Sequence, residues 1–379
     1  MTEYRFIEPY DTLFFRGNRL FGEAPGGGEA LMPPWPSAFA GALRSTMLVH
    51  AGVAPADVAN GRLAGALADC MGSVTAPGAF TLSGVTLAEC SENGLETFHP
   101  LPADMVIHED PSGITVQRLQ PVPLPAGIAS SASSARLPVA QAAERGKPLG
   151  GYWLTGQGWA RYLRGEIPGP DEIRHQSELW QSDPRLGIAL DSTRRRAAEG
   201  QLYTTEGIRL ARNVGFLVTV DGVPEGLLPG AATLRLGGDG GSARMASIDP
   251  PPGAGADNEA LHTDNACRVV LTSPGLFPDG WQLPGAADGS WPALSGAARI
   301  TAAAVPRATT VSGWDLAQHR PKPAQRCAPA GSVYWLEGIR EAQEALRKIA
   351  NEGLWHLTSD NVSSSRRAEG FNRCVIANA

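Results

Sequence analysis

The residues best suited to binding chemistry lie in a glycine-rich stretch over 234–247, which reads Leu-Arg-Leu-Gly-Gly-Asp-Gly-Gly-Ser-Ala-Arg-Met-Ala-Ser. Glycine lacks a Cβ, so it adopts positive φ angles and lets another backbone come close. Successive N–H groups in such a loop can form an anion nest, and Arg244 at its exit carries a guanidinium suited to phosphate oxygens. A plain hairpin whose turn is supported by Asp239 is the more common outcome. The stretch therefore predicts either a phosphate-binding loop or a hairpin turn.

A second candidate is the basic run Arg194, Arg195 and Arg196, which lies between two strand-like stretches. This pattern predicts a long hairpin near 185–205 with the arginines at its tip. A charge run is usually a solvated face, but the chain as a whole has a net charge of −6. A concentrated positive tip on such a protein indicates an anionic partner.

Arginine dominates the basic residues, since only three of the 32 are lysines. Arginine favours planar, bidentate contacts to phosphates or bases, although a genomic bias gives the same composition. With its glycine loops and arginine clusters the chain suits a single-stranded nucleic acid. Trp153, Trp314 and Phe371 are aromatic candidates for stacking on bases, although any one of them is more often part of a core.

Catalytic and metal sites are not predicted. The spacing Gly238-x-Gly240-x-x-Ala243 has no helix pattern after it, so it fails as a dinucleotide motif. The adjacent His-Glu-Asp at 108–110 is expected to form a solvated turn, and we expect no metal and no cofactor. The five cysteines are widely spaced without a C-x-x-C pair, which predicts free thiols. His50 is the one histidine that fits a general base, although capping of a helix C-terminus is the more common role.

The elements that must position these residues form two α+β units of similar plan. Phe39, Leu43 and Met47 recur at helical spacing after Ser37, a natural N-cap, which predicts a helix over 38–50. Further helices are predicted over 156–164 and 341–350, and strands over 4–15, 79–90, 215–221, 266–272, 297–304, 331–336 and 374–377.

A proline- and glycine-rich run from Asp249 to Asp257 is the clearest linker. We therefore expect an N-terminal domain over 1–250, a linker over 251–262 and a C-terminal domain over 263–379. The Ala/Ser/Pro-rich segment 121–148 is an expected surface insertion in the first domain. With 379 residues, 42% hydrophobic content, no apolar run near 20 residues and no signal-peptide pattern, the chain is expected to be globular, cytoplasmic and without a membrane partner.

These features together resemble a known family. Matching runs are Glu8-Pro-Tyr-Asp-Thr-Leu-Phe-Phe-Arg-Gly, Pro34-Trp-Pro-Ser-Ala-Phe-Ala-Gly-Ala-Leu-Arg44, Leu202-Tyr-Thr-Thr-Glu206, Leu236-Gly-Gly-Asp-Gly240, Gly280-Trp281, Ser312-Gly-Trp-Asp315, Pro321-Lys-Pro323 and Pro329-Ala-Gly-Ser-Val-Tyr334. Over almost its whole length the chain resembles the RAMP-superfamily subunits that cap the 5′ tag of the guide RNA (crRNA) in type III-B (Cmr) CRISPR effector complexes.

The resemblance implies an α+β fold of two ferredoxin-like (RRM-type) domains with long loop insertions in the first. It implies a non-catalytic subunit that binds the crRNA 5′ tag, bridges the large palm-domain subunit to the backbone RAMP subunit, and meets target RNA only indirectly. The loops at 237–241 and at Gly370 correspond to the superfamily's signature loops, with Asn372 where a further glycine is favoured. The expected RNA-binding residues are Arg16, Arg19, Arg44, Arg194, Arg195, Arg196, Gly237, Gly238, Gly240, Gly241, Arg244, Arg326, Arg366, Arg367, Gly370 and Phe371.

Two other functions stay open on the sequence. A RAMP-type, metal-independent endoribonuclease that processes precursor crRNA would share the fold but needs a general acid or base, for which His50 is the candidate. A protein-only adaptor, whose surfaces meet other subunits and never touch RNA, is mildly favoured by the acidic net charge.

Overall fold

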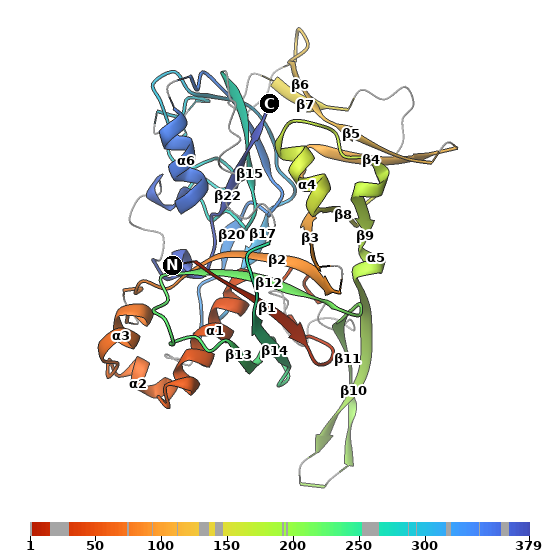
Figure 1. The fold of residues 1–379 in the computed structure, drawn as a ribbon. Coiled ribbons are helices and arrows are strands. Elements are labelled where there is room, and N and C mark those ends of the chain that lie inside the picture. Colours follow the sequence, from red (N-terminus) through yellow and green to blue (C-terminus); the bar gives the residue numbers. More distant parts are fainter. Residues whose placement is uncertain are drawn as a thin grey trace.

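The computed structural model describes residues 2–15, 30–73, 76–92, 94–111, 113–128, 136–140, 147–191, 193–194, 196–251, 265–286, 288–292, 294–315, 320–340, 342–357 and 364–379. The predicted linker over 251–262 therefore lies outside the described residues except for Pro251, as do Arg16 and Arg19. The fold is α+β and is built mostly from antiparallel sheets (Figure 1).

The larger sheet has eight strands in the order β13-β14-β1-β12-β2-β3-β8-β9, with every neighbouring pair antiparallel. The strands are β1 (Glu3–Pro9), β2 (Thr81–Ser91), β3 (Gly94–Pro100), β8 (Tyr152–Thr155), β9 (Ile173–His175), β12 (Val214–Asp221), β13 (Ala231–Arg235) and β14 (Ser242–Ser247). The first strand is central, because Phe6 pairs with Leu217 on one side and with Ala246 on the other. It ends at Pro9, so the prediction of a strand to residue 15 was too long.

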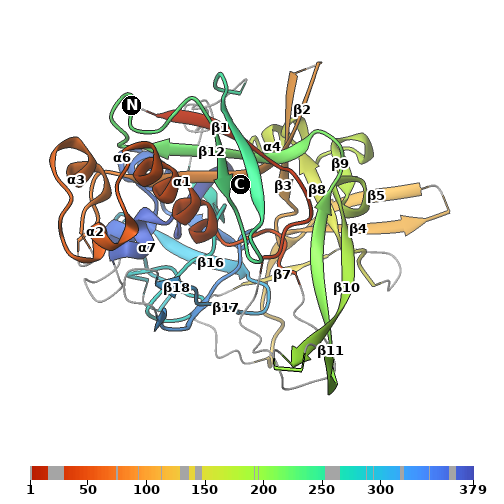
Figure 2. The same ribbon diagram turned by 90° about the horizontal axis from the view of Figure 1, so that it is seen from below.

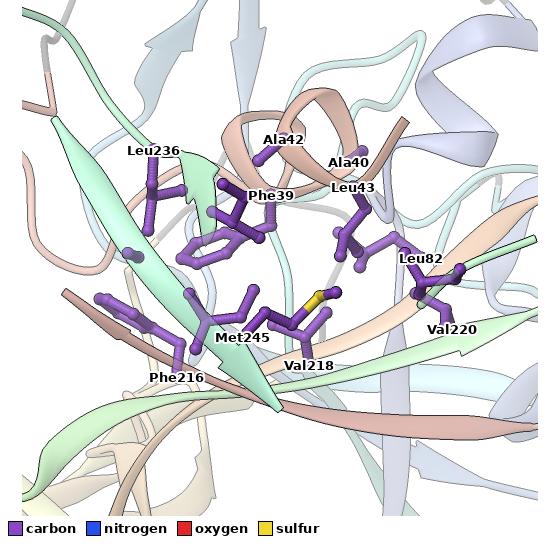
Figure 3. Packing of buried hydrophobic residues seen from close by; sticks show 14 of the residues in the cluster. Phe39, Ala40, Ala42, Leu43, Leu82, Phe216, Val218, Val220, Leu236 and Met245 are labelled. Carbon is purple, nitrogen blue, oxygen red and sulfur yellow. The ribbon is translucent and has the colours of Figure 1, made fainter. Parts of the chain in front are cut away.

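Helix α1 (Pro36–His50) covers one face of this sheet. Phe39, Leu43 and Met47 are fully buried in one cluster with residues of the sheet. Figure 3 shows Phe39 and Leu43 facing Phe216, Val218 and Met245 of the sheet. Their spacing of four residues places them on one stripe of the helix, which confirms the predicted helix. The expected N-cap was wrong. Trp35 is the N-cap, and the helix begins at Pro36, two residues before the predicted start, where the fixed φ of proline suits the first helical position.

The smaller sheet has four antiparallel strands in the order β16-β21-β15-β22. They are β15 (Ala266–Leu271), β16 (Arg299–Ala304), β21 (Val333–Glu337) and β22 (Cys374–Asn378). Helix α6 (Gln343–Glu352) packs Leu346 and Ile349 against it, and the five-residue α7 (Ser364–Ala368) precedes the last strand. All four strands and α6 were predicted within a few residues.

The remaining elements are short helices and hairpins. The helices are α2 (Pro55–Ala59), α3 (Gly65–Met71), α4 (Gly156–Leu163), α5 (Gln176–Leu179) and the 3-10 turns Pro170–Glu172 and Leu354–Leu357. The hairpins are β4 (Met105–Asp110) with β5 (Gly113–Arg118), β6 (Gln120–Pro123) with β7 (Arg136–Val139), β10 (Trp180–Asp191) with β11 (Arg196–Leu210), β17 (Thr309–Val311) with β20 (Gln325–Cys327), and β18 (Trp314–Asp315) with β19 (Arg320–Pro321). The β6–β7 hairpin lies where only a surface insertion was expected.

The β10–β11 hairpin extends well beyond the rest of the molecule (Figures 1 and 2). It is longer than the 185–205 that the sequence predicted. Its base is held by a bridge between Leu13 and Ile208 and by the hydrogen bond from Thr12 Oγ1 to Asp183, 2.7 Å long. Arg194 and Arg196 are exposed at its tip, which confirms the predicted placement of these two residues.

The two halves of the chain share one hydrophobic cluster. It joins Met105, Leu154 and Trp159 of the first half to Val270 and Trp335 of the second. In this cluster, apolar side chains from the two sheets shield each other from water. The two halves are therefore packed against each other and are not joined by a linker alone.

A buried ion pair sits inside this shared cluster. Arg268 on β15 and Asp104 are both fully buried, with 2.6 Å between Nη1 and the carboxylate. The Tyr162 hydroxyl donates to the other carboxylate oxygen at 2.8 Å, and the guanidinium lies over the Tyr162 ring at 4.4 Å. Arg268 also donates to the main-chain oxygens of Tyr162 and Asn378, so the two halves are joined by a hydrogen-bonded charge pair as well as by apolar packing.

Protonation of His99 on β3 is expected to make the stability of the fold sensitive to acid. Its ring stacks on Trp159 with 4.5 Å between centroids, and burial lowers its pKa from 6.5 to about 3. Because the folded state disfavours the charged ring, the unfolded chain binds the extra proton, and stability is lost as pH falls from 6.5 towards 3.

We therefore expect the free energy of unfolding to fall by up to about 1.4 kcal/mol per pH unit in that window through this one group. Urea unfolding of wild type and of His99→Phe between pH 7 and pH 4 measures this pH dependence of the free energy of unfolding. The variant should lose part of the acid sensitivity, and equal pH slopes in the two proteins would contradict the assignment.

The structure also bears on the predictions about the cysteines and about membrane-spanning segments. All five cysteines are free thiols, as predicted, and all except Cys90 are buried. No helix within the described ranges combines the length and apolarity needed to cross a bilayer.

Candidate nucleic-acid interface

A groove of about 1330 Å³ runs between α1, strand β13 and a segment of the second half of the chain. Its walls come from the stretches that carried the family resemblance: the start of α1, the glycine loop after β13, and Ser312-Gly-Trp with Lys322. Residues that are far apart in the sequence thus line one concave surface. We call it the α1–β13 groove.

The glycine loop forms one wall of this groove and closes the β13–β14 hairpin. Gly237 and Gly240 have φ values of 78° and 76°, and Asp239 has 55°. Gly238 donates its N–H to the Phe14 main-chain oxygen at 2.8 Å, and a Cβ on Gly237 would stand 3.0 Å from that same oxygen. Gly237 therefore allows a close approach to the main chain at Phe14, whereas Gly240 has nothing within 4 Å of its Cβ position and leaves the backbone open.

The opposite wall is a small-residue face of α1. Ser37, Ala38, Gly41, Ala42 and Ser45 all line the groove, and a Cβ on Gly41 would meet nothing within 4 Å. Small side chains let a ligand backbone approach the helix closely. The first turn of α1 has neither a side-chain cap nor an acidic residue, so the positive end of the helix dipole is not neutralised there and favours an anion.

Two cationic side chains of the groove were missed by the sequence reasoning as binding residues. Arg235, the last residue of β13, is exposed and lines the groove, and Lys322 lines it from the other side. Arg235 alternates with the buried Leu234 and Leu236, a pattern that could have placed it on the outer face. Trp314 on β18 is 56% exposed on the same wall as Lys322, so a cation and an aromatic ring face one space.

Arg366 and Phe371, both expected at RNA, are inside the protein. Arg366 is 2% exposed and donates to Glu369, Gln325 and the Ser312 main chain, while its guanidinium lies 5.3 Å from the Phe371 ring. Phe371 is fully buried, so its ring is closed to stacking in this structure. Lys322 is bound to Glu369 as well. This network fixes the second wall of the groove.

Gly370 and Arg44 lie at the junction of the two halves. Gly370 is buried with φ 88°, and a Cβ there would stand 2.8 Å from the Leu82 carbonyl oxygen of β2. The absence of a side chain at Gly370 therefore lets this loop pack closely against β2 of the larger sheet. Arg44 is half-buried over the Phe80 ring at 5.2 Å, and burial lowers its pKa. Asn372, where a glycine was expected, has φ 58° and holds Leu276 through its side chain.

The remaining arginines are on the surface but do not gather at the groove. Arg244 is exposed and ion-paired to Glu8 at 2.7 Å, on β14 beside the glycine loop. Arg326 and Arg367 are exposed, and Arg194 and Arg196 lie at the hairpin tip. The side chain of Arg195 lies outside the described residues. The arginines expected at RNA therefore lie in several places, with Arg194 and Arg196 at the hairpin tip and the others elsewhere on the surface.

The sequence named His50 as the candidate general base and expected no metal site. No group of three His, Cys, Asp or Glu side chains within the described part of the chain is arranged to hold a metal ion. His50 ends α1, is exposed and lines the groove. Its position at the helix C-terminus suits the capping role that the sequence favoured.

A model of the family described as "CRISPR-associated protein (Cas_Cmr3)" matches residues 5–379. No curated protein matches the sequence. Among solved structures, the chain is similar to one from "Cryo-EM structure of the Type III-B Cmr-beta bound to cognate target RNA", with a TM-score of 0.52, 15% identity, and 98% of this chain and 96% of that chain covered. A chain from the same complex with AMPPnP gives a TM-score of 0.51 at the same identity and coverage.

Proposed function

The chain belongs to the CRISPR-associated Cas_Cmr3 family, and we propose that it is a non-catalytic, crRNA-binding subunit of a type III-B effector complex. The RNA segment it holds is the single-stranded 5′ tag, and the α1–β13 groove is where it lies. The observation that carries this proposal is the groove itself, which combines exposed backbone at Gly240 and Gly41, a cation at Arg235 and an exposed ring at Trp314.

Each part of that surface suits single-stranded RNA. Open backbone and the uncapped start of α1 favour phosphate oxygens, Arg235 adds a charge that follows the RNA backbone, and Trp314 offers a stacking surface for a base. The solved chain with the same fold comes from a complex bound to cognate target RNA. In the present chain the hairpin tip with Arg194 and Arg196 would extend the contact beyond the groove.

The fold supports a two-domain origin. The strands β14-β1-β12-β2 and β22-β15-β21-β16 have the same antiparallel order, in which the first strand of each unit lies between its last and its third. That order is the expected one for ferredoxin-like units over 1–250 and 263–379, with β3, β8 and β9 added to the first. We propose further that the surfaces away from the groove meet the large palm-domain subunit and the backbone RAMP subunit.

The proposal is tested by the salt dependence of binding to a fluorescent, 5′-tagged single-stranded RNA. For Arg194→Ala with Arg196→Ala, and separately for Arg235→Ala, we expect weaker binding. The slope of log K against log salt should also be smaller by about 0.7 for each phosphate that the variant no longer neutralises. Arg164→Ala is the matched control, because this exposed arginine pairs with Glu166 and lines neither the groove nor the hairpin.

Unchanged affinity and slope in both variants would favour the protein-only adaptor instead. Incubation with precursor crRNA tests the non-catalytic role. Metal-independent cleavage by wild type that disappears in His50→Ala would replace the proposed function by that of a processing endoribonuclease.

A further inference from the structure

Hydroxyl groups outnumber charged side chains in the lining of the α1–β13 groove. They belong to six residues from α1, from β13 and β14, and from the second half of the chain, so each wall of the groove carries at least one. The six residues are Ser37, Ser45, Thr46, Thr233, Ser242 and Ser312.

Three of these hydroxyls are available to a ligand. The two threonines already make hydrogen bonds inside the protein, and Ser312 is engaged as well. Ser37, Ser45 and Ser242 are half-buried and make no hydrogen bond to another described residue. Because a hydroxyl both donates and accepts, each of these three serines can pair with a ligand group of either kind.

Two of the available serines are aligned along α1. Ser37 and Ser45 are eight residues apart in the sequence, which is about two helical turns, so they lie on the same face of the helix. Gly41 lies between them, and a Cβ there would meet nothing within 4 Å. A ligand can therefore lie against the helix from one serine to the other.

The spacing of the two serines suits a polymer better than a small molecule. Eight residues correspond to about 12 Å along the helix axis. Neighbouring nucleotides of one stacked strand are only about 3.4 Å apart. A single strand that lies along α1 would therefore meet Ser37 and Ser45 with two different nucleotides.

The charged side chains of the groove are largely neutralised by the protein itself. Lys322 and Arg366 are both ion-paired with the buried Glu369. Arg235 is thus the one cation of the lining without an ion pair among the described residues. Attraction between cations and phosphates is common to RNA and DNA, whereas the 2′-hydroxyl is the group by which a protein tells RNA from DNA. A lining with several available hydroxyls and one available cation therefore suits recognition of ribose.

We propose that Ser37 and Ser45 make the groove select RNA over DNA of the same sequence, through hydrogen bonds to the 2′-hydroxyls of two nucleotides. Ser242, at the start of β14 on the opposite wall, is placed for a third such contact. The inference rests on the proposed function, because it concerns RNA in the same groove, and it adds the sugar as a group that is recognised.

The first measurement compares 5′-tagged single-stranded RNA with DNA of the same sequence, by fluorescence anisotropy on the full chain. Wild type should bind the RNA more tightly. Ser37→Ala with Ser45→Ala should weaken binding of the RNA by roughly tenfold or more, the scale of two neutral hydrogen bonds, and leave binding of the DNA unchanged. Alanine is the best helix former, so α1 should fold as before. Ser177→Ala is the matched control, because this exposed helical serine does not line the groove.

The second measurement uses RNAs that carry one 2′-deoxy nucleotide, placed at each tag position in turn. For wild type we expect two positions at which the change weakens binding by about twofold to tenfold, the scale of one neutral hydrogen bond. One of these positions should have no effect in Ser37→Ala, and the other should have none in Ser45→Ala. A 2′-fluoro nucleotide, which keeps the RNA-like sugar pucker but cannot donate, should weaken binding at the same positions, so that hydrogen bonding is separated from sugar shape.

The outcomes for this inference and for the proposed function are distinct. Equal affinity of wild type for RNA and DNA, an unchanged preference for RNA in the double serine variant, or equal losses on both nucleic acids would each overturn the inference and leave the proposed function standing. Wild type that binds no tagged RNA would overturn the proposed function itself. A reduced preference for RNA in the double variant, with binding of DNA retained, supports the two serines as the residues that read the sugar.

Discussion

Replacing Arg268 by methionine is expected to lower the free energy of unfolding by about 3–5 kcal/mol, because it leaves the Asp104 carboxylate buried without its cation. The carboxylate would keep one hydrogen bond, from the Tyr162 hydroxyl at 2.8 Å. The main-chain oxygens of Tyr162 and Asn378 would lose their donors at the same time. Urea unfolding followed by circular dichroism measures the change.

The double variant Arg268→Met with Asp104→Leu is the control for this result. It removes both charges, and replacing a buried pair by apolar groups is often close to neutral. We therefore expect the double variant to recover much of the stability lost in the single one. A single variant as stable as wild type would show that the pair does not hold the halves together.

Trp314→Ala is expected to weaken binding of tagged single-stranded RNA by about 1–3 kcal/mol, the range for losing one base stack. The side chain is 56% exposed on the wall of the α1–β13 groove, so its loss should leave the fold intact. No charge is removed, and the salt slope should stay as in wild type. Fluorescence anisotropy at several salt concentrations measures both quantities.

Trp281→Ala is the matched control, because this ring is also partly exposed but does not line the groove. It should bind RNA as wild type does. Equal losses in the two tryptophan variants would indicate a general effect on the protein and count against the groove as the binding surface.

The parts of the fold that the sequence predicted are those in which a side-chain period reports burial directly. Helix α1 was found because Phe39, Leu43 and Met47 all face one sheet. Strands β12 and β15 were found because they are almost continuously apolar and buried. The hairpin was predicted over 185–205, and the part that was missed is its base at 180–184 and 206–210. Residues 181–184 read Gln-Ser-Asp-Pro, which lacks an apolar alternation and ends in a proline that argues against a strand.

The site was predicted less well, for a different physical reason. Burial of a loop residue is decided by which distant segment packs on it. The glycines at 237–241 and the Ser312-Gly-Trp run were recognised separately, yet only the folded chain shows that they share a groove. Arg366 carries the charge expected of an RNA contact, and the distant Gln325 and Ser312 take up its donors. The residues around Arg366 in the sequence do not predict its contacts with these distant residues.

The central place of β1 in the larger sheet has a consequence for how the chain folds during synthesis. Its partners β12 and β14 begin at Val214 and Ser242, so both pairings close loops of roughly 200 residues or more. Contacts of such long range slow folding. At about 5–20 residues per second, the ribosome needs roughly ten to fifty seconds to supply the second partner. Over that interval β1 has two unpaired edges and exposes Phe6 and Ile7, which are buried in the folded protein, so the strand is prone to aggregation until its partners are made.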